Sequence, residues 1–199
     1  MTGAAPACDR LGLALSTTAA AAQAYVDGAS LLWRIMLYAD APPPLPWQDL
    51  AAYGERVWPQ PAVPFIDVHC AMASAGGGDA DAARRRADAL AALAADARLP
   101  PGALPGVLAR AAAAYAAGDF AAAADAIEAM LADLPRLGGS HAQREVHEET
   151  LIRACLHCGR TQRARVLLEQ RLARRPSAVD ARWLDAAGAH ASATVSGGD

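Results

Sequence analysis

The sequence predicts an all-α protein in which pairs of helices stack into a right-handed α-solenoid. Hydrophobic residues make up 54% of the 199 residues, yet aromatic residues make up only 5%, so alanine and leucine supply most of the apolar surface. Both residues favour helix, and alanine allows helices to pack closely. An internal repeat and the positions of glycine and proline predict the same class.

The repeat has a period of 41 residues and runs through the middle of the chain. Three sets of residues recur at this interval: Gly77, Gly118 and Gly159; Ala82, Ala123 and Ala164; Leu90, Leu131 and Leu172. We expect each glycine to end a helix in the left-handed conformation, each alanine to lie where helices cross, and each leucine to fill the layer beneath. The order of residues resembles the second half of a tetratricopeptide repeat, whose usual length is roughly 34 residues. About three tetratricopeptide-like pairs with flanking helices are therefore expected, and HEAT-type pairing is the alternative.

Helix periodicity and helix-breaking residues set the individual elements. Two proline-rich stretches, DAPPPLPW over 40–47 and LPPGALPG over 99–106, must interrupt helices because proline lacks an N–H donor and restricts the residue before it. The predicted helices span 9–20, 22–39, 46–57, 62–75, 79–97, 103–117, 120–135, 140–158, 161–174 and 177–189. The predicted domains are a weakly helical or partly disordered segment over 1–21, a helical-repeat domain over 22–190 and a disordered tail over 191–199.

Charge and cysteine content indicate which kinds of partner and which cellular location are expected. The formal net charge is −3, and all 18 basic residues are arginine, so no global field attracts nucleic acid. The arginine runs over 83–88 and 162–176 lack neighbouring aromatic residues for stacking and are interpreted as solvated helix faces. Four cysteines are too few for a disulfide framework, and neither a signal peptide nor a membrane-spanning stretch is recognisable. The expected location is the cytoplasm, without a nucleic-acid or membrane partner.

The stretch LGGSHAQREVHEETL, over 137–151, is interpreted first as a helix start. Two glycines precede Ser140, which forms an S-x-x-Q capping box with Gln143. The alternative is an anion site, because His141 and Arg144 lie one turn apart at a helix amino terminus. The HEETL segment does not form a zinc-protease motif, since Leu151 stands where that motif needs a second histidine.

Histidine and cysteine residues leave a second alternative open, a metal- or anion-dependent enzyme or accessory protein. Cys155 and Cys158 form a C-x-x-C pair that zinc could use. The repeat favours core packing for Cys155 instead, because it places this residue at an alanine position of the other units. The candidate residues for the alternative are His69, His141, His147, Cys155 and Cys158. No cofactor is expected.

Several segments resemble the carboxy-terminal half of the tetratricopeptide repeat protein 38 family. They are DGASLLWRIML over 27–37, WQDLAAYGE over 47–55, FIDVHCAMASAG over 65–76, LGGSHAQREVHEETLIRACL over 137–156 and ARVLLEQRLARRPSA over 164–178. The resemblance covers about residues 22–190. It implies an α-solenoid with a concave binding surface and no established reaction, and it implies that an amino-terminal half present in the family is missing here.

The predicted function is a protein-interaction or scaffold module, not an enzyme, that holds a partner peptide or small polar ligand on its concave face. In tetratricopeptide-like arrays the first helix of each pair lines that face. With the histidine and anion-site candidates included, the predicted contact residues are Asp67, His69, Tyr115, His141, Arg144, Glu149, Arg153 and His157. A further alternative is a homo-oligomer, in which the apolar helix over 22–38 would be covered by residues 1–20 or by another protomer.

Overall fold

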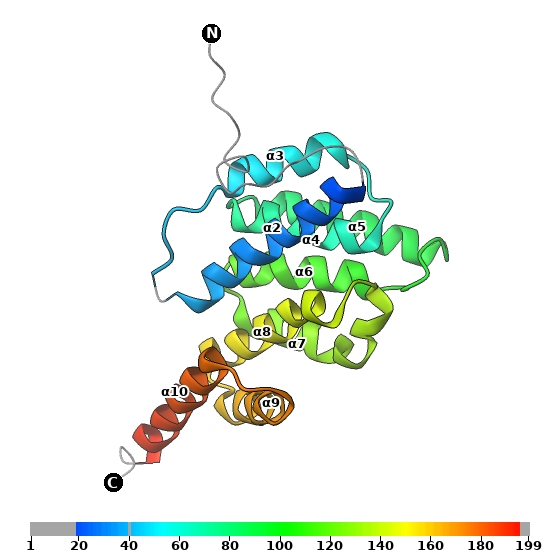
Figure 1. Ribbon diagram of the computed structural model, residues 1–199. Coiled ribbons are helices and arrows are strands. Elements are labelled where there is room, and N and C mark those ends of the chain that lie inside the picture. Colours follow the sequence, from blue (N-terminus) through cyan, green and yellow to red (C-terminus); the bar gives the residue numbers. More distant parts are fainter. Residues whose placement is uncertain (1–18, 40, 196–199) are drawn as a thin grey trace.

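The computed structural model describes the backbone of residues 19–39 and 41–195 and the side chains up to residue 188, and within these ranges the chain is all-helical (Figure 1). The elements are α2 (Ala19–Tyr38), α3 (Trp47–Val57), α4 (Pro64–Gly76), α5 (Ala80–Ala95), α6 (Leu104–Ala116), α7 (Phe120–Met130), the 3-10 helix η1 (Leu131–Leu137), α8 (His141–His157), α9 (Thr161–Arg174) and α10 (Ala178–Val195). The helix predicted over 9–20 and the segment predicted over 1–21 lie almost entirely outside the described residues. The all-α prediction is confirmed for the described part of the chain.

Three helical hairpins, α4–α5, α6–α7 and α8–α9, follow one another along the chain. Helix α6 packs against α4, α5 and α7, and α8 packs against α7 and α9. Helix α3 lies on α4, and α10 lies on α9. Helix α2 crosses the hairpins and packs against both α4 and α8 (Figure 1). We call the side of α4, α6 and α8 that α2 covers the inner face.

The turns inside the hairpins correct the predicted repeat. The left-handed glycines are Gly78, Gly118 and Gly159, with φ of 88°, 80° and 79°. Gly77 has φ −75° and is right-handed, so the first unit is one residue shorter than the 41-residue interval implies. The fully buried alanine of the first unit is accordingly Ala83, whereas Ala82 is half-buried.

The leucine set of the repeat is wrong as a set of equivalent core positions. Leu90 is fully buried, but Leu131 and Leu172 are only half-buried. Leu131 also begins η1, which replaces the last part of the helix predicted over 120–135. Pro135 accounts for this change, because it cannot donate the hydrogen bond that a continuing α-helix needs at its position.

The interior is built from a few large rings and many alanines. The ring of Trp33 lies 6.1 Å from that of Trp47 and 5.9 Å from that of Tyr115, between centroids. Close packing leaves no room for a side chain at Gly76, where an added Cβ would lie 2.6 Å from the ring of Trp47. The aromatic residues are few, but they lie where α2, α3 and α6 meet.

The first and last described helices, α2 and α10, bear on the homo-oligomer hypothesis and on the predicted disordered tail. Val26, Leu32 and Trp33 of α2 are buried within the chain, whereas Leu31 of the same helix is 50% exposed. The homo-oligomer hypothesis stays a prediction. Helix α10 continues to Val195, which corrects the start of the disordered tail predicted over 191–199; residues 196–199 lie outside the described residues. None of the described helices combines the length and the apolar character needed to cross a membrane.

Candidate binding site

The inner face, which carries the predicted contact residues His69 and Glu149, is covered by α2. Trp33 is 1% exposed, and its indole N–H donates to Thr150 Oγ1 at 2.9 Å. Arg34 donates from Nε to Glu149 at 2.7 Å and from its terminal nitrogen to the carbonyl of Ala142 at 2.8 Å. A partner could reach Thr150 and Glu149 of α8 only if α2 moved away.

Asp67 is buried in a structural cluster and not on an accessible face. Its carboxylate accepts from the N–H groups of Ala62 and Val63 at 3.0 and 2.9 Å, and from Arg86 at 2.7 Å. Arg86 also donates to the carbonyl of Trp58 at 2.6 Å. Burial raises the pKa of Asp67, and these hydrogen bonds oppose that change. The cluster ties the segment after α3 to α4 and α5.

His69 lies under α2, next to a second buried histidine. Its Nδ1 is 2.7 Å from the carbonyl of Phe65, which can only accept, so Nδ1 carries the proton and Nε2 accepts from the hydroxyl of Ser30 at 3.0 Å. The ring of His147 lies 6.4 Å away, between centroids, and its Nε2 has no hydrogen-bond partner among the described residues. Burial lowers the pKa of His69 to about 4 and that of His147 to about 3, and the nearby His69 contributes to the second shift.

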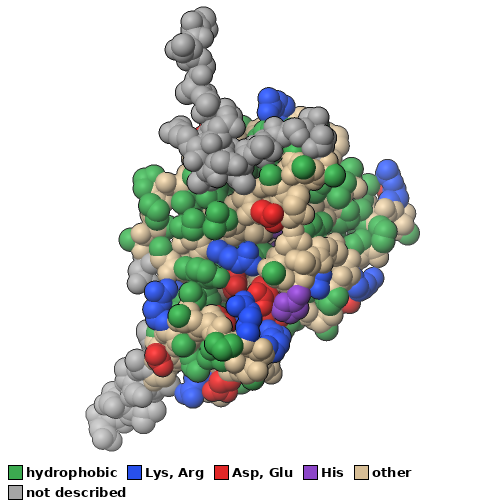
Figure 2. Space-filling view, viewed as in Figure 1, with side chains coloured by type: hydrophobic (Ala, Val, Ile, Leu, Met, Phe, Trp, Pro, Cys, Tyr) green, Lys and Arg blue, Asp and Glu red, His purple; other side chains and the backbone are tan. Residues whose placement is uncertain are grey.

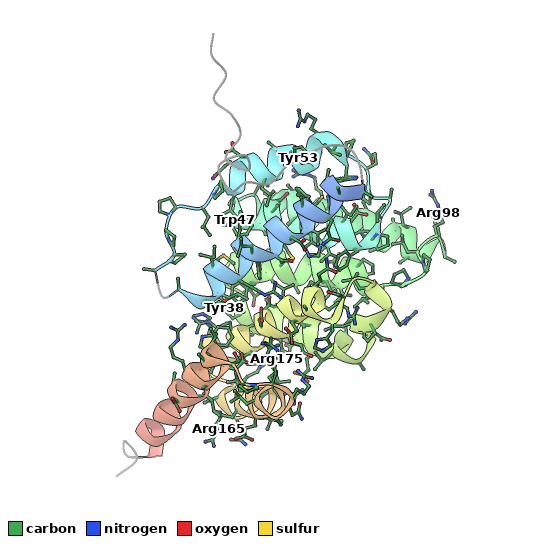
Figure 3. The ribbon with its side chains drawn as sticks, in the orientation of Figure 1. Tyr38, Trp47, Tyr53, Arg98, Arg165 and Arg175 are labelled. Atoms are coloured by element: carbon green, nitrogen blue, oxygen red, sulfur yellow. The ribbon has the colours of Figure 1, made fainter. Side chains whose placement is uncertain are left out.

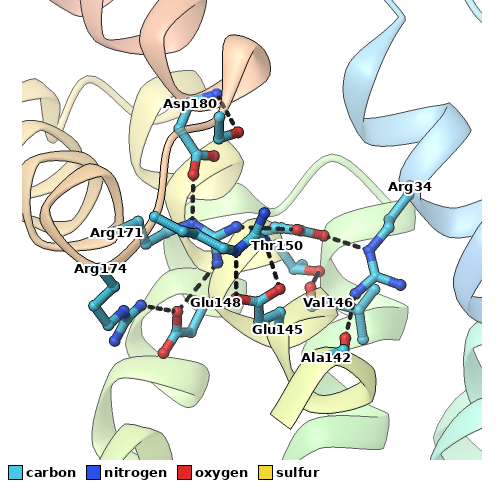
Figure 4. A network of polar contacts seen from close by, with 12 residues as sticks. Arg34, Ala142, Glu145, Val146, Glu148, Thr150, Arg171, Arg174 and Asp180 are labelled. Carbon is cyan, nitrogen blue, oxygen red and sulfur yellow. Dashed lines mark hydrogen bonds and ion pairs between the residues drawn. The ribbon is translucent and has the colours of Figure 1, made fainter.

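Glu149 belongs to a network of arginines and acids that joins α2, α8, α9 and α10 (Figure 4). Arg171, 4% exposed, is at its centre and contacts three carboxylates, those of Glu148 and Glu149 at 3.1 Å and that of Asp180 at 3.0 Å. Arg174 and Arg175 extend the network to Glu148 and Glu145. Figure 2 shows basic and acidic side chains gathered on one part of the surface. Glu149 thus forms ion pairs with two arginines of its own chain, Arg34 and Arg171.

Tyr115, Arg153 and His157 are brought together at the carboxyl end of α8. Arg153 lies 5.3 Å from the centroid of the Trp183 ring and within hydrogen-bonding reach of Tyr115, and burial raises the pKa of Tyr115 to about 12. His157 is exposed and stacks on Phe120 at 4.4 Å between ring centroids. Tyr38, labelled in Figure 3, closes the other side of Trp183 at 5.3 Å. This group packs α10 and the α6–α7 turn onto α8, and Arg153 is not in an ion pair among the described residues.

His141 and Arg144 both make contacts within the chain at the start of α8. The predicted capping box is present, with Gln143 N–H donating to Ser140 Oγ at 3.2 Å and Ser140 N–H donating to Gln143 Oε1 at 2.7 Å. Arg144 turns back and donates to the carbonyls of Gly138 and Gly139. His141 lies 3.6 Å from the carboxylate of Glu145. The side chains of His141 and Arg144 are thus engaged inside the chain, and the anion site stays a prediction.

The residues of the metal alternative are dispersed. His69 and His147 are buried together, Cys155 and Cys158 lie at the end of α8, and His141 is exposed at the start of that helix. In the part of the chain that the structure describes, no three His, Cys, Asp or Glu side chains are grouped so as to hold a metal ion. Burial raises the pKa of the Cys155 thiol to about 11, which disfavours the thiolate that zinc or redox chemistry uses.

An accessible groove of about 560 Å³ lies between α3 and α5, above α4. Gln48, at the start of α3, donates to the carbonyl of Gly77 at 3.4 Å, just before α5, and Glu55 near the end of α3 lies 3.5 Å from Arg86. The two helices therefore run in the same direction along the groove. Its lining residues are Gln48, Ala51, Ala52, Glu55, Pro59, Gln60, Pro61, Ser74, Gly77, Asp79, Ala82, Arg85, Arg86 and Ala89.

This groove is not predicted from the sequence, although the lining residues on each wall follow a helical spacing. On α3 the lining residues Gln48, Ala51, Ala52 and Glu55 follow the i, i+3, i+4, i+7 pattern, and on α5 so do Ala82, Arg85, Arg86 and Ala89. Alanine lies at the centre of the α3 stripe and at both ends of the α5 stripe, where the small side chains leave space between the two helices, whereas Arg85 and Arg86 lie at the centre of the α5 stripe. The arginine run over 83–88 was interpreted as a solvated face, and only the placement of α3 shows that part of it faces a groove.

Searches against protein-family models, curated proteins and solved structures each found no match. The resemblance to the tetratricopeptide repeat protein 38 family therefore stays a prediction, and a function has to be argued from the geometry of the chain itself.

Proposed function

We propose that this chain is an interaction module of the tetratricopeptide-like solenoid type, and that it binds a segment of another protein in the groove between α3 and α5. Consecutive helical hairpins with left-handed glycine turns support the solenoid assignment. Such arrays usually bind through surfaces that stacked helices create, not through a reaction centre.

The inner face and the groove differ in their accessibility to a partner. The inner face is covered by α2, whose Trp33 and Arg34 satisfy the polar groups beneath them. The groove, by contrast, has solvent-exposed lining residues, among them Gln48, Ala52 and Gln60. A groove of about 560 Å³ is large enough to accept several residues of a peptide.

Site-specific photo-crosslinking tests the location. A photoreactive phenylalanine analogue replaces Ala52, in the groove wall, or Ala129, which is exposed on α7 and serves as the matched control. Irradiation in the native cell extract should give discrete protein adducts from position 52 and not from position 129. The substitution Ala89→Trp, which fills the groove from the α5 side, should remove these adducts while the helical circular dichroism spectrum is retained. Equal adducts from both positions, or adducts that persist with Ala89→Trp, would contradict the proposal.

A further inference from the structure

Of the two arginines that line the groove, one has an ion pair within the chain and the other does not. This difference indicates the chemistry of the ligand. Arg86 faces the groove but is balanced by the buried carboxylate of Asp67 at 2.7 Å. Arg85, its neighbour on the same wall, is exposed and makes no ion pair with any described residue. Glu55 is 70% exposed and lies 3.5 Å from Arg86. Arg85 is therefore a groove cation without an ion pair; Asp81, one turn earlier in α5, acts on it only electrostatically, so a ligand carboxylate can still pair with it.

The uncharged polar residues point to the conformation of the ligand. Gln48 and Gln60 bring side-chain amides to the groove, and Ser74 of α4 brings a hydroxyl to its floor. These groups can pair with main-chain N–H and C=O groups, which an extended peptide offers and a helix has already used internally. The alanines along both walls leave space for a backbone but form no deep pocket for a large side chain.

Resting on the proposed function, we infer that the groove binds an extended peptide segment with an acidic side chain that pairs with Arg85. Two other ligand classes fit the lining less well. The lining contains no aromatic ring on which the bases of a nucleic acid could stack. Small-molecule sites are mostly apolar with aromatic side chains, whereas this lining has no aromatic ring and half of its residues are polar or charged.

The test starts from a displayed library of random 12-residue peptides selected on the immobilised full-length chain. We expect the selected peptides to share Asp or Glu at one position. A synthetic peptide of the shared sequence is then titrated by fluorescence anisotropy against four proteins: the natural chain, Arg85→Glu, Ala89→Trp and Arg98→Glu. The last is the matched control, because Arg98 is an exposed arginine that projects from the loop after α5, away from the lining (Figure 3).

Arg85→Glu should weaken binding at least tenfold, because an attractive charge pair becomes a repulsive one, and Arg98→Glu should change it less than twofold. Replacing the shared acid of the peptide with lysine should restore binding to Arg85→Glu. A loss of binding through misfolding of the variant cannot produce this restoration.

The outcomes separate the two proposals. Selected peptides that bind equally well to Ala89→Trp, or a selection with no shared sequence, would overturn both the groove as the binding site and its acidic ligand. Peptides that lose binding with Ala89→Trp but carry no acid, or that ignore Arg85→Glu, would overturn only the acidic class. Binding of a 12-nucleotide single-stranded RNA that Ala89→Trp abolishes would replace the peptide with a nucleic acid.

Discussion

One residue of the backbone stands in a conformation that its side chain disfavours. Ala97, after α5, has φ 55° and is the only non-glycine residue with a positive φ among the described residues. The next N–H, from Arg98, returns to the carbonyl of Leu93 at 2.9 Å, as in a Schellman turn. The corresponding turns after α4 and α6 place Gly78 and Gly118 at the left-handed position. Alanine there carries a steric cost of roughly 1–2 kcal/mol.

Ala97→Gly should therefore stabilise the protein by up to about 1 kcal/mol, because relief of the left-handed strain outweighs the greater freedom of glycine in the unfolded chain. The matched control is Ala117→Gly, since Ala117 also ends a helix but has φ −79°. This control should lower the free energy of unfolding by a few tenths to about 1 kcal/mol. Urea unfolding of both variants checks the opposite signs, and a loss of stability with Ala97→Gly would contradict the assigned turn.

At the scale of the elements, helix positions were far easier to predict than helix neighbours. The range 22–39 anticipates α2 from apolar periodicity, and the capping box at Ser140 anticipates the start of α8. The position of α2 on the inner face depends on the contact between Trp33 and Thr150, which are 117 residues apart in sequence. Local patterns carry no information about such a pairing. Two of the predicted binding residues, His69 and Glu149, are therefore in contact with α2, although the range of α2 itself was predicted nearly correctly.

The packing of α2 can be tested through its central ring. Trp33→Ala should cost about 3–5 kcal/mol, because it opens a cavity and leaves Thr150 without its indole donor. Leu31→Ala in the same helix is the control, since Leu31 is 50% exposed and should change stability by no more than about 0.5 kcal/mol. Chemical unfolding gives both values, and hydrogen exchange should show the α2 amides losing protection first. Similar costs for the two variants would mean that α2 is not docked as described.

Polar contacts between hairpins supplement the hydrophobic core of the described residues. Arg171 of α9 connects to α8 and α10, and Arg34 connects α2 to the same acidic residue of α8, Glu149. A buried ion pair of this kind loses roughly 3–5 kcal/mol when one partner is removed. Single charges on α8 and α9 could be recognised in the sequence, but their pairing across helices could not. For the same reason the groove between α3 and α5 became visible only once the two helices were placed.

The two buried histidines should make the stability of the protein depend on pH. Both His69 and His147 are buried under α2, and their folded pKa values of about 4 and about 3 lie below the usual value of 6.5. As the pH falls below 6.5, the two histidines bind protons in the unfolded chain but not in the folded chain. The free energy of unfolding therefore decreases progressively with decreasing pH. At pH 5 the loss should reach about 2 kcal/mol for each histidine relative to pH 7.5.

Guanidinium unfolding between pH 7.5 and 5 measures this loss in a window above the titration of ordinary carboxylates. His147→Leu should remove about half of the pH dependence, because its ring nitrogen Nε2 has no hydrogen-bond partner among the described residues and the apolar substitute cannot take up a proton. His141→Gln is the control, because that side chain is 65% exposed and its removal should leave most of the slope unchanged. A slope that His147→Leu leaves intact but His141→Gln abolishes would show that the acid response originates at the surface, and that α2 does not keep the histidine pair neutral.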